Sequence, residues 1–166
     1  MKKMKLAMLA MSVALIFTNC GTTKSTDSSP NSSSSSKSSA EVHETSPINF
    51  NYTADLDGAM VRAKKENKPI FIDFYTTWCA PCKLMDQGTF KDQDIASYLN
   101  DNCVTLKVDA EKDNGRALRV QYNVSVFPTL VFIDPDGNVV SQRDGSLGID
   151  AFKQFMKTAV WKYKGN

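Results

Sequence analysis

The chain has 166 residues, 42% of them hydrophobic, and this length favours one domain over several. Its 20 basic and 18 acidic residues nearly balance, and because three lysines fall in the first 19 residues, the remainder holds 17 basic against 18 acidic residues. A chain so close to neutrality gives no electrostatic reason to bind nucleic acid, and we expect no nucleic-acid partner.

The first 19 residues have the pattern of a secretory signal peptide. Lys2, Lys3 and Lys5 form a positive segment, and residues 6–17 form a run of 12 weakly polar to apolar residues. A membrane-spanning helix needs about 20 apolar residues, so this run is too short to span a bilayer. We expect residues 1–19 to be a signal peptide.

Cys20 directly follows the apolar run. Residues 17–21, Phe-Thr-Asn-Cys-Gly, resemble the lipobox of bacterial lipoproteins, in which the cysteine is acylated and becomes the first residue of the mature chain. Phe17 and Asn19 depart from the usual residues at their positions, and the alternative is a cleaved signal followed by a chance cysteine. The resemblance implies lipidation at Cys20 and a protein anchored to a membrane of the bacterial cell envelope, facing the periplasm.

Residues 20–46 are predicted to be a disordered linker behind this lipid anchor. Residues 21–46 contain 11 serines and no aromatic residue, and Val42 is their only sizeable apolar residue. Such a segment cannot bury enough surface to offset the entropy lost on ordering. His43, the only histidine, lies in the linker and is expected to be inert, because a tether does not hold a side chain in a fixed geometry.

Residues 47–163 are predicted to form one α/β domain in which helices flank a central mixed sheet. The apolar spacing predicts helices at 56–63, from 79 onward, at 94–99, 116–122 and 149–160, and strands at 70–75, 104–108, 130–133 and 138–142. An Asp-Pro-Asp-Gly turn at 134–137 predicts an antiparallel hairpin between the last two strands. Strands that alternate with helices are typical of α/β proteins.

Two of the four cysteines, Cys79 and Cys82, lie where a strand is expected to lead into a helix. The unpaired N–H groups of a helix start stabilise a thiolate and lower a cysteine pKa from about 8.5 toward 7 or below. Cys82 lies on the same helix face, close enough to attack a mixed disulfide, and Pro81 suits a first helical turn. The pattern predicts thiol–disulfide exchange in which an exposed Cys79 attacks and a shielded Cys82 resolves.

A zinc site and a purely structural disulfide are the alternatives for this pair. A structural zinc site needs a second pair of ligands, and only Cys103 and His43 remain, at unsuitable spacing, so no metal and no cofactor are expected. A disulfide that closes so short a loop constrains the unfolded chain little. Cys103 begins an apolar strand, and we expect a buried core residue there rather than a regulatory thiol.

These patterns resemble the thioredoxin superfamily over most of residues 55–160. Residues 71–75 and the sequence Trp-Cys-Ala-Pro-Cys-Lys at 78–83 resemble its first central strand and active-site turn, and Val-Phe-Pro-Thr at 126–129 resembles its cis-proline loop. The resemblance implies a thioredoxin fold, a redox-active Cys79–Cys82 disulfide, and Trp78 and Pro128 beside it.

The resemblance also implies two supporting acids. Asp73 matches the buried acid below the cysteine pair. The Lys-Pro at 68–69 and Thr-Phe at 89–90 resemble the C-terminal domain of DsbD-type electron transporters and its single-domain relatives, in which Asp86 would be a second carboxylate. The alternative for Asp86 is a solvated surface acid. Negative charge at both positions would oppose a thiolate.

Two departures from the family pattern are expected to matter. Thioredoxins proper carry a lysine beside the buried acid, and an alignment on Asp109 places Thr105 at that position, so Asp73 is expected to lack a counter-charge. Phe127 is bulkier than the usual Ile or Val before the proline, so the family's partner preference does not carry over.

The sequence therefore predicts a monomeric protein-disulfide reductase that acts on disulfide-containing envelope proteins and receives electrons from an upstream thiol donor. Reduction is favoured because Cys-Ala-Pro-Cys with a buried acid resembles the reducing branch of the family. A disulfide oxidase or isomerase, or a binding module without catalysis, are the alternatives.

The Cys20→Ser change tests the anchor. Because the acyl chain is attached to this cysteine, we expect the wild-type protein in the membrane fraction and the variant in the soluble fraction when cells are fractionated. A wild-type protein that is already soluble and unacylated would contradict the lipobox interpretation.

Overall fold

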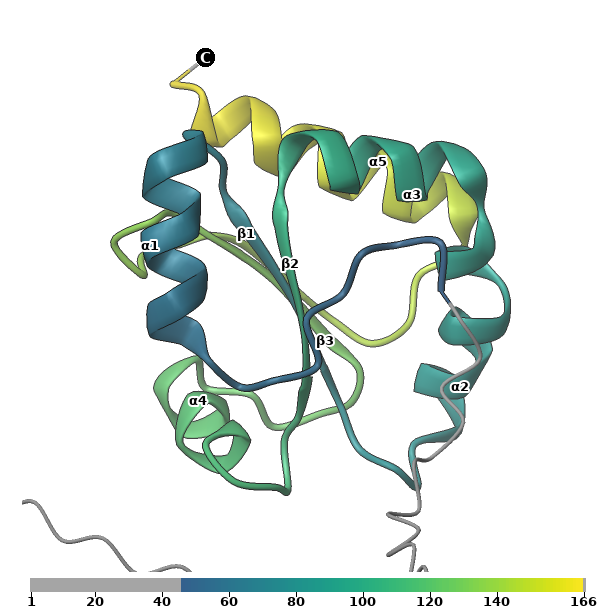
Figure 1. Ribbon diagram of the computed structural model, residues 1–166. Helices are drawn as coiled ribbons and strands as arrows, with labels where there is room; N and C mark the ends of the chain where they lie inside the picture. The colour runs from purple at the N-terminus through teal and green to yellow at the C-terminus, as the bar shows by residue number, and fades with distance from the viewer. Residues whose placement is uncertain (1–45, 166) are drawn as a thin grey trace, which may run out of the picture. The chain divides into compact units, whose positions relative to one another are not determined.

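The computed structural model describes residues 46–165 (Figure 1). The helices are α1 Leu56–Glu66, α2 Ala80–Gln87, α3 Gln93–Asn102, α4 Gly115–Gln121 and α5 Ile149–Tyr163, with a short 3-10 helix, η1, at Thr89–Lys91. The strands are β1 Ile70–Tyr75, β2 Val104–Asp109, β3 Thr129–Ile133 and β4 Val139–Asp144. None of the helices in this described part is long and apolar enough to cross a membrane.

The four strands form one mixed sheet in the order β2-β1-β3-β4, which confirms the predicted fold class. β1 pairs in parallel with β2, and β3 runs antiparallel to both of its neighbours, β1 and β4. The predicted elements all appear, with ends that differ by a few residues, and the turn at 134–137 joins β3 to β4 as expected. The 3-10 helix η1 was not predicted.

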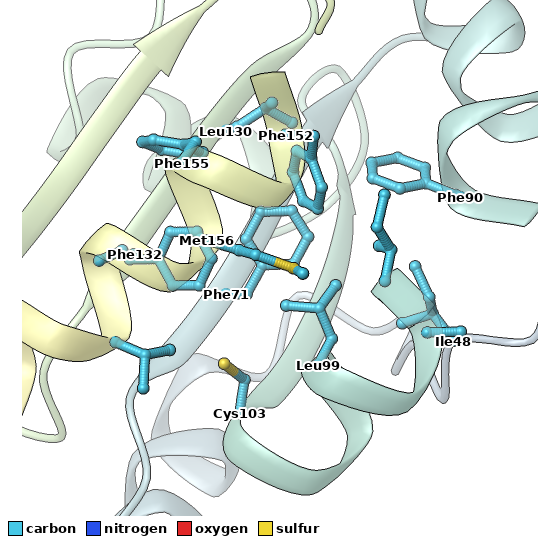
Figure 2. Close-up of a cluster of buried hydrophobic side chains, with 14 of the residues drawn as sticks. Ile48, Phe71, Phe90, Leu99, Cys103, Leu130, Phe132, Phe152, Phe155 and Met156 are labelled. Carbon is cyan, nitrogen blue, oxygen red and sulfur yellow. The ribbon is translucent and has the colours of Figure 1, made fainter. Parts of the chain in front are cut away.

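Alternating side chains of the central strands divide between two cores, one on each face of the sheet. Phe71, Leu130 and Phe132 point to the face covered by α2, α3 and α5, where they pack with Phe90 and Phe152 (Figure 2). The intervening strand residues point to the face covered by α1 and α4: Ile70, Ile72, Phe74, Val104, Leu106, Val108, Val131 and Ile133. The even-numbered residues of β1 and β2 therefore face the core under α1 and α4, and the odd-numbered residues face the side covered by α2, α3 and α5.

The outer edge of β2 is met by the segment that precedes α1 (Figure 1). The Asn51 backbone N–H donates to the carbonyl of Thr105 at 3.0 Å, and the Lys107 N–H donates to the carbonyl of Asn51 at 2.9 Å. These two bonds form a single parallel bridge between Asn51 and Leu106. We call residues 46–51 the strap.

Candidate active site

The structure joins Cys79 to Cys82 by a disulfide at the start of α2, with an S–S distance of 2.02 Å and a Cα–Cα distance of 5.3 Å. Cys79 is the N-cap of the helix, and its Sγ accepts a hydrogen bond from the Cys82 backbone N–H at 3.1 Å. Pro81 occupies the first turn, where its missing N–H leaves no helical bond unmade. One otherwise unpaired N–H of the helix start is thus directed at a sulfur atom.

The prediction that Cys79 is exposed is wrong for this disulfide form. Cys79 and Cys82 are each only 2% exposed. Cys79 is tied to Cys82 and is flanked in sequence by Trp78, whose ring packs edge-on against Phe127 with centroids 6.0 Å apart. Trp78 itself is 65% exposed, so the surface around the disulfide is presented by this aromatic side chain rather than by sulfur.

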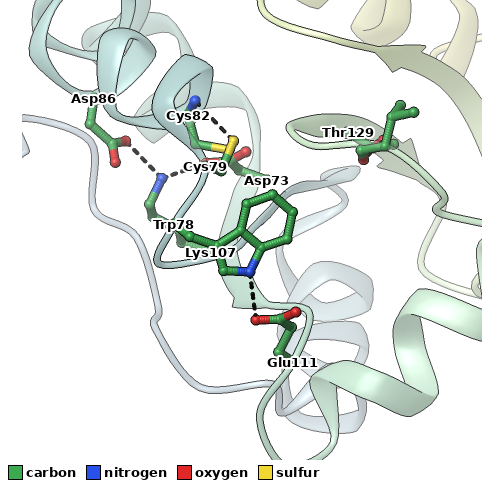
Figure 3. Close-up of a disulfide and its surroundings, with 9 residues drawn as sticks. Asp73, Trp78, Cys79, Cys82, Asp86, Lys107, Glu111 and Thr129 are labelled. Atoms are coloured by element: carbon green, nitrogen blue, oxygen red, sulfur yellow. Dashed lines mark hydrogen bonds and ion pairs between the residues drawn. A yellow bond between two sulfur atoms is a disulfide. The ribbon is translucent and has the colours of Figure 1, made fainter.

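The Trp78–Phe127 pair is held from both ends. The Trp78 Nε1–H donates to a Glu111 carboxylate oxygen at 3.0 Å (Figure 3). The Arg119 guanidinium lies 5.2 Å from the centre of the Phe127 ring, and its Nε–H donates to the Val124 carbonyl at 3.1 Å. Neither Glu111 nor Arg119 was predicted, because nothing in their local sequence distinguishes them from other charged residues of an exposed loop and helix.

The cis-proline loop lies beside this pair. The peptide bond between Phe127 and Pro128 is cis, and Pro128 is buried. The Thr129 hydroxyl bonds the Val126 carbonyl at 2.8 Å and an Asp144 carboxylate oxygen at 3.2 Å, which ties the loop to the end of β4 that pairs with Thr129.

The expectation that Asp73 lacks a counter-charge is wrong, and the missed residue is Lys107. The Lys107 Nζ contacts Asp73 Oδ2 at 2.5 Å and Asp86 Oδ1 at 2.7 Å (Figure 3). Asp73 and Lys107 are direct partners in the parallel register of β1 and β2. Thr105, which the alignment had placed beside Asp73, is two residues away in that register, opposite Phe71, and its hydroxyl donates to the Asn49 carbonyl at 2.7 Å.

The two acids and Lys107 form a cluster that lies under α2. Asp86 and Cys82 are four residues apart on that helix, so they share the face that covers the sheet. Asp73 and Lys107 project from the sheet toward the same side, because they alternate with the residues of the other core. We call Asp73, Lys107 and Asp86 the charge cluster.

Burial controls the protonation of this cluster. Burial raises the pKa of Asp73, and the charge of Lys107 only partly opposes that rise. Burial alone would lower the pKa of Lys107, but the adjacent carboxylates of Asp73 and Asp86 outweigh it and raise the pKa, so Lys107 stays charged. Asp73 Oδ1 has no hydrogen-bond partner among the described residues. A buried carboxyl with one free oxygen and a raised pKa can accept a proton from a neighbouring group.

Three aromatic rings complete the surroundings of Lys107. The Nζ lies 4.9 Å from the ring centre of Tyr75, 5.3 Å from that of Phe90 and 5.4 Å from that of Phe50. The electron-rich faces of such rings attract a cation while excluding water.

Cys103, the remaining described thiol, is 3% exposed, and burial raises its pKa to about 12. It is therefore protonated and shielded, as expected for a core residue. Within residues 46–165, no group of three or more His, Cys, Asp or Glu side chains gathers as metal ligands do.

The chain is similar to known proteins of one family. A family model described as a thioredoxin-like domain matches residues 56–159. Over 104 residues the chain is 33% identical to the thiol:disulfide interchange protein DsbD of Pseudomonas fluorescens, a match that covers 61% of this chain but only 18% of that protein's length. Over 86 residues it is 41% identical to Thioredoxin-T of Drosophila melanogaster, which covers 52% of this chain and 50% of that protein.

Two solved structures show the same fold. One is the solution structure of a proposed disulphide-isomerase from Bacteroides thetaiotaomicron, 38% identical, with a TM-score of 0.60 over 70% of this chain and 96% of that one. The other is the oxidised C-terminal domain of DsbD from Neisseria meningitidis, 26% identical, with a TM-score of 0.55 over 66% of this chain and 97% of that one.

The raised pKa of Asp73 predicts a pH dependence of stability. The folded protein binds this proton more tightly than the unfolded chain does, so the contribution is present at low pH and is lost as the pH rises through the folded-state pKa. Asp73→Asn cannot titrate. Its free energy of unfolding relative to wild type should therefore increase between about pH 4 and about pH 8, as measured by urea unfolding of the oxidised proteins.

The matched control for this experiment is Asp57→Asn, since Asp57 lies exposed in the first turn of α1. Its difference from wild type should change little over the same range. A difference for Asp73→Asn that stays constant, or that falls as the pH rises, would contradict the assignment.

Proposed function

The chain belongs to the thioredoxin-like domain family, as a thiol:disulfide oxidoreductase with the Cys79–Cys82 pair, and we propose that it is a monomeric protein-disulfide reductase of the bacterial cell envelope. The observation that carries the proposal is the disulfide at the N-terminus of α2, above the charge cluster, in which two carboxyl groups face one ammonium group.

The dithiol form performs the reduction in two steps. The Cys79 thiolate attacks one sulfur of a partner's disulfide, the partner's S–S bond breaks, and one partner thiol leaves. Cys82 then attacks the Cys79 sulfur of the mixed disulfide and releases the second partner thiol. Two electrons pass to the partner, and the chain is left with the Cys79–Cys82 disulfide. An upstream thiol donor must reduce this bond before the next cycle.

The surroundings supply what each step needs. The N–H groups at the start of α2 stabilise the Cys79 thiolate, which lowers its pKa. Cys82 must lose its proton before it attacks, and Asp73, with a raised pKa and an unpartnered oxygen under the same helix, is the acceptor that the site provides. Lys107 keeps its own proton and balances the charge that remains.

The charge cluster favours reduction over oxidation. Strong thiol oxidants owe their high potential to a stabilised reduced form, chiefly a stabilised thiolate. Once Asp73 is ionised, two carboxylates face one ammonium group, and the excess negative charge and the burial of Asp73 oppose a thiolate. The disulfide is therefore favoured relative to the dithiol, which makes the dithiol the better electron donor.

The envelope location rests on the N-terminal sequence and on the bacterial relatives. Residues 1–45, which hold the expected signal peptide, Cys20 and all but the last residue of the expected linker, lie outside the described part of the chain. The proposal is that the thioredoxin-like domain, residues 47–163, acts on disulfide-containing envelope proteins from a lipid anchor at Cys20. The chain spans 18% of the length of the Pseudomonas fluorescens DsbD.

An isomerase is the second candidate, because the Bacteroides thetaiotaomicron structure is a proposed disulphide-isomerase. An isomerase restores native pairings in a scrambled protein without net consumption of reductant. Recovery of scrambled ribonuclease activity at a catalytic concentration of the chain, with its pair mostly reduced throughout, would favour this candidate over the reductase.

The reduction potential of the pair tests the direction of electron flow. We expect a value below about −200 mV, toward that of thioredoxin, when the pair is equilibrated with glutathione or dithiothreitol buffers. The dithiol form should also reduce insulin, and Cys79→Ser should abolish that activity. A potential near −120 mV would instead mark a strong oxidant and favour the oxidase.

Trapping of mixed disulfides tests the roles of the two cysteines. Cys82→Ser keeps the attacking thiol and removes the resolving one, so partner proteins should accumulate as covalent adducts on a non-reducing gel and disappear with reductant. Cys79→Ser should trap little, because Cys82 lies within the first turn of α2, whereas Cys79 caps the N-terminus of that helix.

Cys103→Ala is the control, since its thiol is protonated and buried and should not contribute to adducts. Adducts that form on Cys82 when Cys79 is absent would reverse the assignment. The absence of adducts in both folded variants would favour a binding module without catalysis.

A further inference from the structure

We propose that the strap, through Phe50, holds Lys107 between Asp73 and Asp86 and keeps water out of the charge cluster, which makes Phe50 a positioning residue for exchange at the Cys79–Cys82 pair. The inference deepens the proposed function and rests on it only for the identity of the reacting pair.

The strap is fixed along its whole length. The Asn100 side chain bonds both neighbours of Ile48, accepting from the Asn49 N–H at 2.9 Å and donating to the Pro47 carbonyl at 3.0 Å. Ile48 is 3% exposed and packs into the core under α3 and α5. Asn51, three residues after Ile48, makes the bridge to β2. Phe50 is therefore held between a buried anchor and a strand bridge.

Phe50 closes one wall around Lys107. Its ring lies 5.5 Å from the Phe90 ring in an edge-to-face contact and 6.2 Å from the Phe71 ring. The Lys107 Nζ lies over the Phe50 ring at 5.4 Å. Since the backbone of Lys107 also donates to Asn51, the strap fixes both ends of this lysine: its main chain through Asn51 and its ammonium group through Phe50.

Exposure falls steeply across the charge cluster. The Asp86 side chain is 39% exposed, whereas those of Lys107 and Asp73 are only 2% and 1% exposed. Among the described residues, the cluster thus meets solvent through Asp86, and the aromatic wall covers the rest. Truncation of Phe50 would open a second route for water, directly to Lys107.

Hydration at Lys107 would change the proton affinity of the site. Burial is the largest cause of the raised pKa of Asp73, so water that enters the cluster lowers that pKa toward its ordinary value. Water also screens the carboxylates, and their opposition to a thiolate at the cysteine pair weakens. Where Asp73 is already ionised, the first effect adds no further charge, and the second lowers the free-energy cost of the Cys79 thiolate, so Cys79 reactivity shifts toward lower pH.

Among the described residues outside the cysteine pair, two tyrosines also lie near the cluster. Tyr75 lies against Lys107 from β1, and Tyr52 interacts electrostatically with all three members of the cluster. Burial raises the pKa of Tyr52 above its ordinary value, so its phenol stays neutral in the range where thiols titrate. The expected shift therefore belongs to the charge cluster and the cysteines.

A graded series at Phe50 tests the proposal in the full chain. We would compare Phe50→Leu, Phe50→Val and Phe50→Ala in the reduced state, and record the rate of Cys79 alkylation by iodoacetamide as a function of pH. The midpoint should move to lower pH as the side chain shrinks, by roughly 0.5–1 unit for the alanine variant, a common size for environmental pKa shifts. The reduction potential should become less negative in the same order.

Ile133→Ala is the matched control, because it removes a fully buried side chain at the end of β3 remote from Pro128, in the other core. It should lower stability without moving the midpoint or the potential. If the alanine variant does not fold, the leucine and valine variants still give the order. Midpoints and potentials that stay at the wild-type values, while stability falls across the series, would overturn the proposal.

These measurements involve no partner protein, so they separate the two proposals. A shifted midpoint in a chain that traps no partner and reduces no disulfide would support the role of Phe50 while contradicting the reductase. An unshifted midpoint in an active reductase would contradict the role of Phe50 alone.

Discussion

The buried ammonium group of Lys107 is the constraint on which the arrangement of this domain depends. A lysine that is 2% exposed is tolerated only where its charge is paired, and its two partners come from different elements: Asp73 from β1 and Asp86 from α2. The pairing therefore fixes the register of β2 on β1 and the seating of α2 on the sheet together. The position of Cys82, one turn before Asp86, follows from the same contacts.

Two opposed influences act on the cysteine pair. The N-terminus of α2 attracts negative charge to Cys79, which is the cap of that helix, whereas the carboxylates below resist it. The helix start stabilises the Cys79 thiolate and so raises the reduction potential of the pair. The acids disfavour the thiolate, which lowers the reduction potential and slows attack. The fold places Cys79 at the helix start and Cys82 over the acids, so the two steps of the proposed exchange would meet different electrostatic conditions.

Much of this could be predicted from the sequence, and the failures have identifiable causes. Hydrophobic patterning and turn residues located the four strands and the five α-helices, though not the 3-10 helix η1, and the spacing of Cys79 and Cys82 located the reactive pair. Lys107 was missed because Thr105 and Lys107 lie on the same face of one strand, so alternation cannot decide which of them meets Asp73; only the pairing register can. The burial of Cys79 was missed because the prediction rested on its place at the start of a helix, and that place does not show which distant parts of the chain pack around it.

The strap also has a consequence for the edge of the sheet. β2 is an outer strand, and an outer strand presents unpaired peptide groups that can template the addition of a foreign strand. At the opposite edge, β4 is interrupted by a register shift in its pairing with β3 and carries the charges of Arg143 and Asp144, features that discourage such pairing. β2 has an apolar inner face and depends instead on Asn51, which occupies the Thr105 carbonyl and the Lys107 N–H. The segment that shapes the reactive site thus also protects the domain from self-association through its most vulnerable strand.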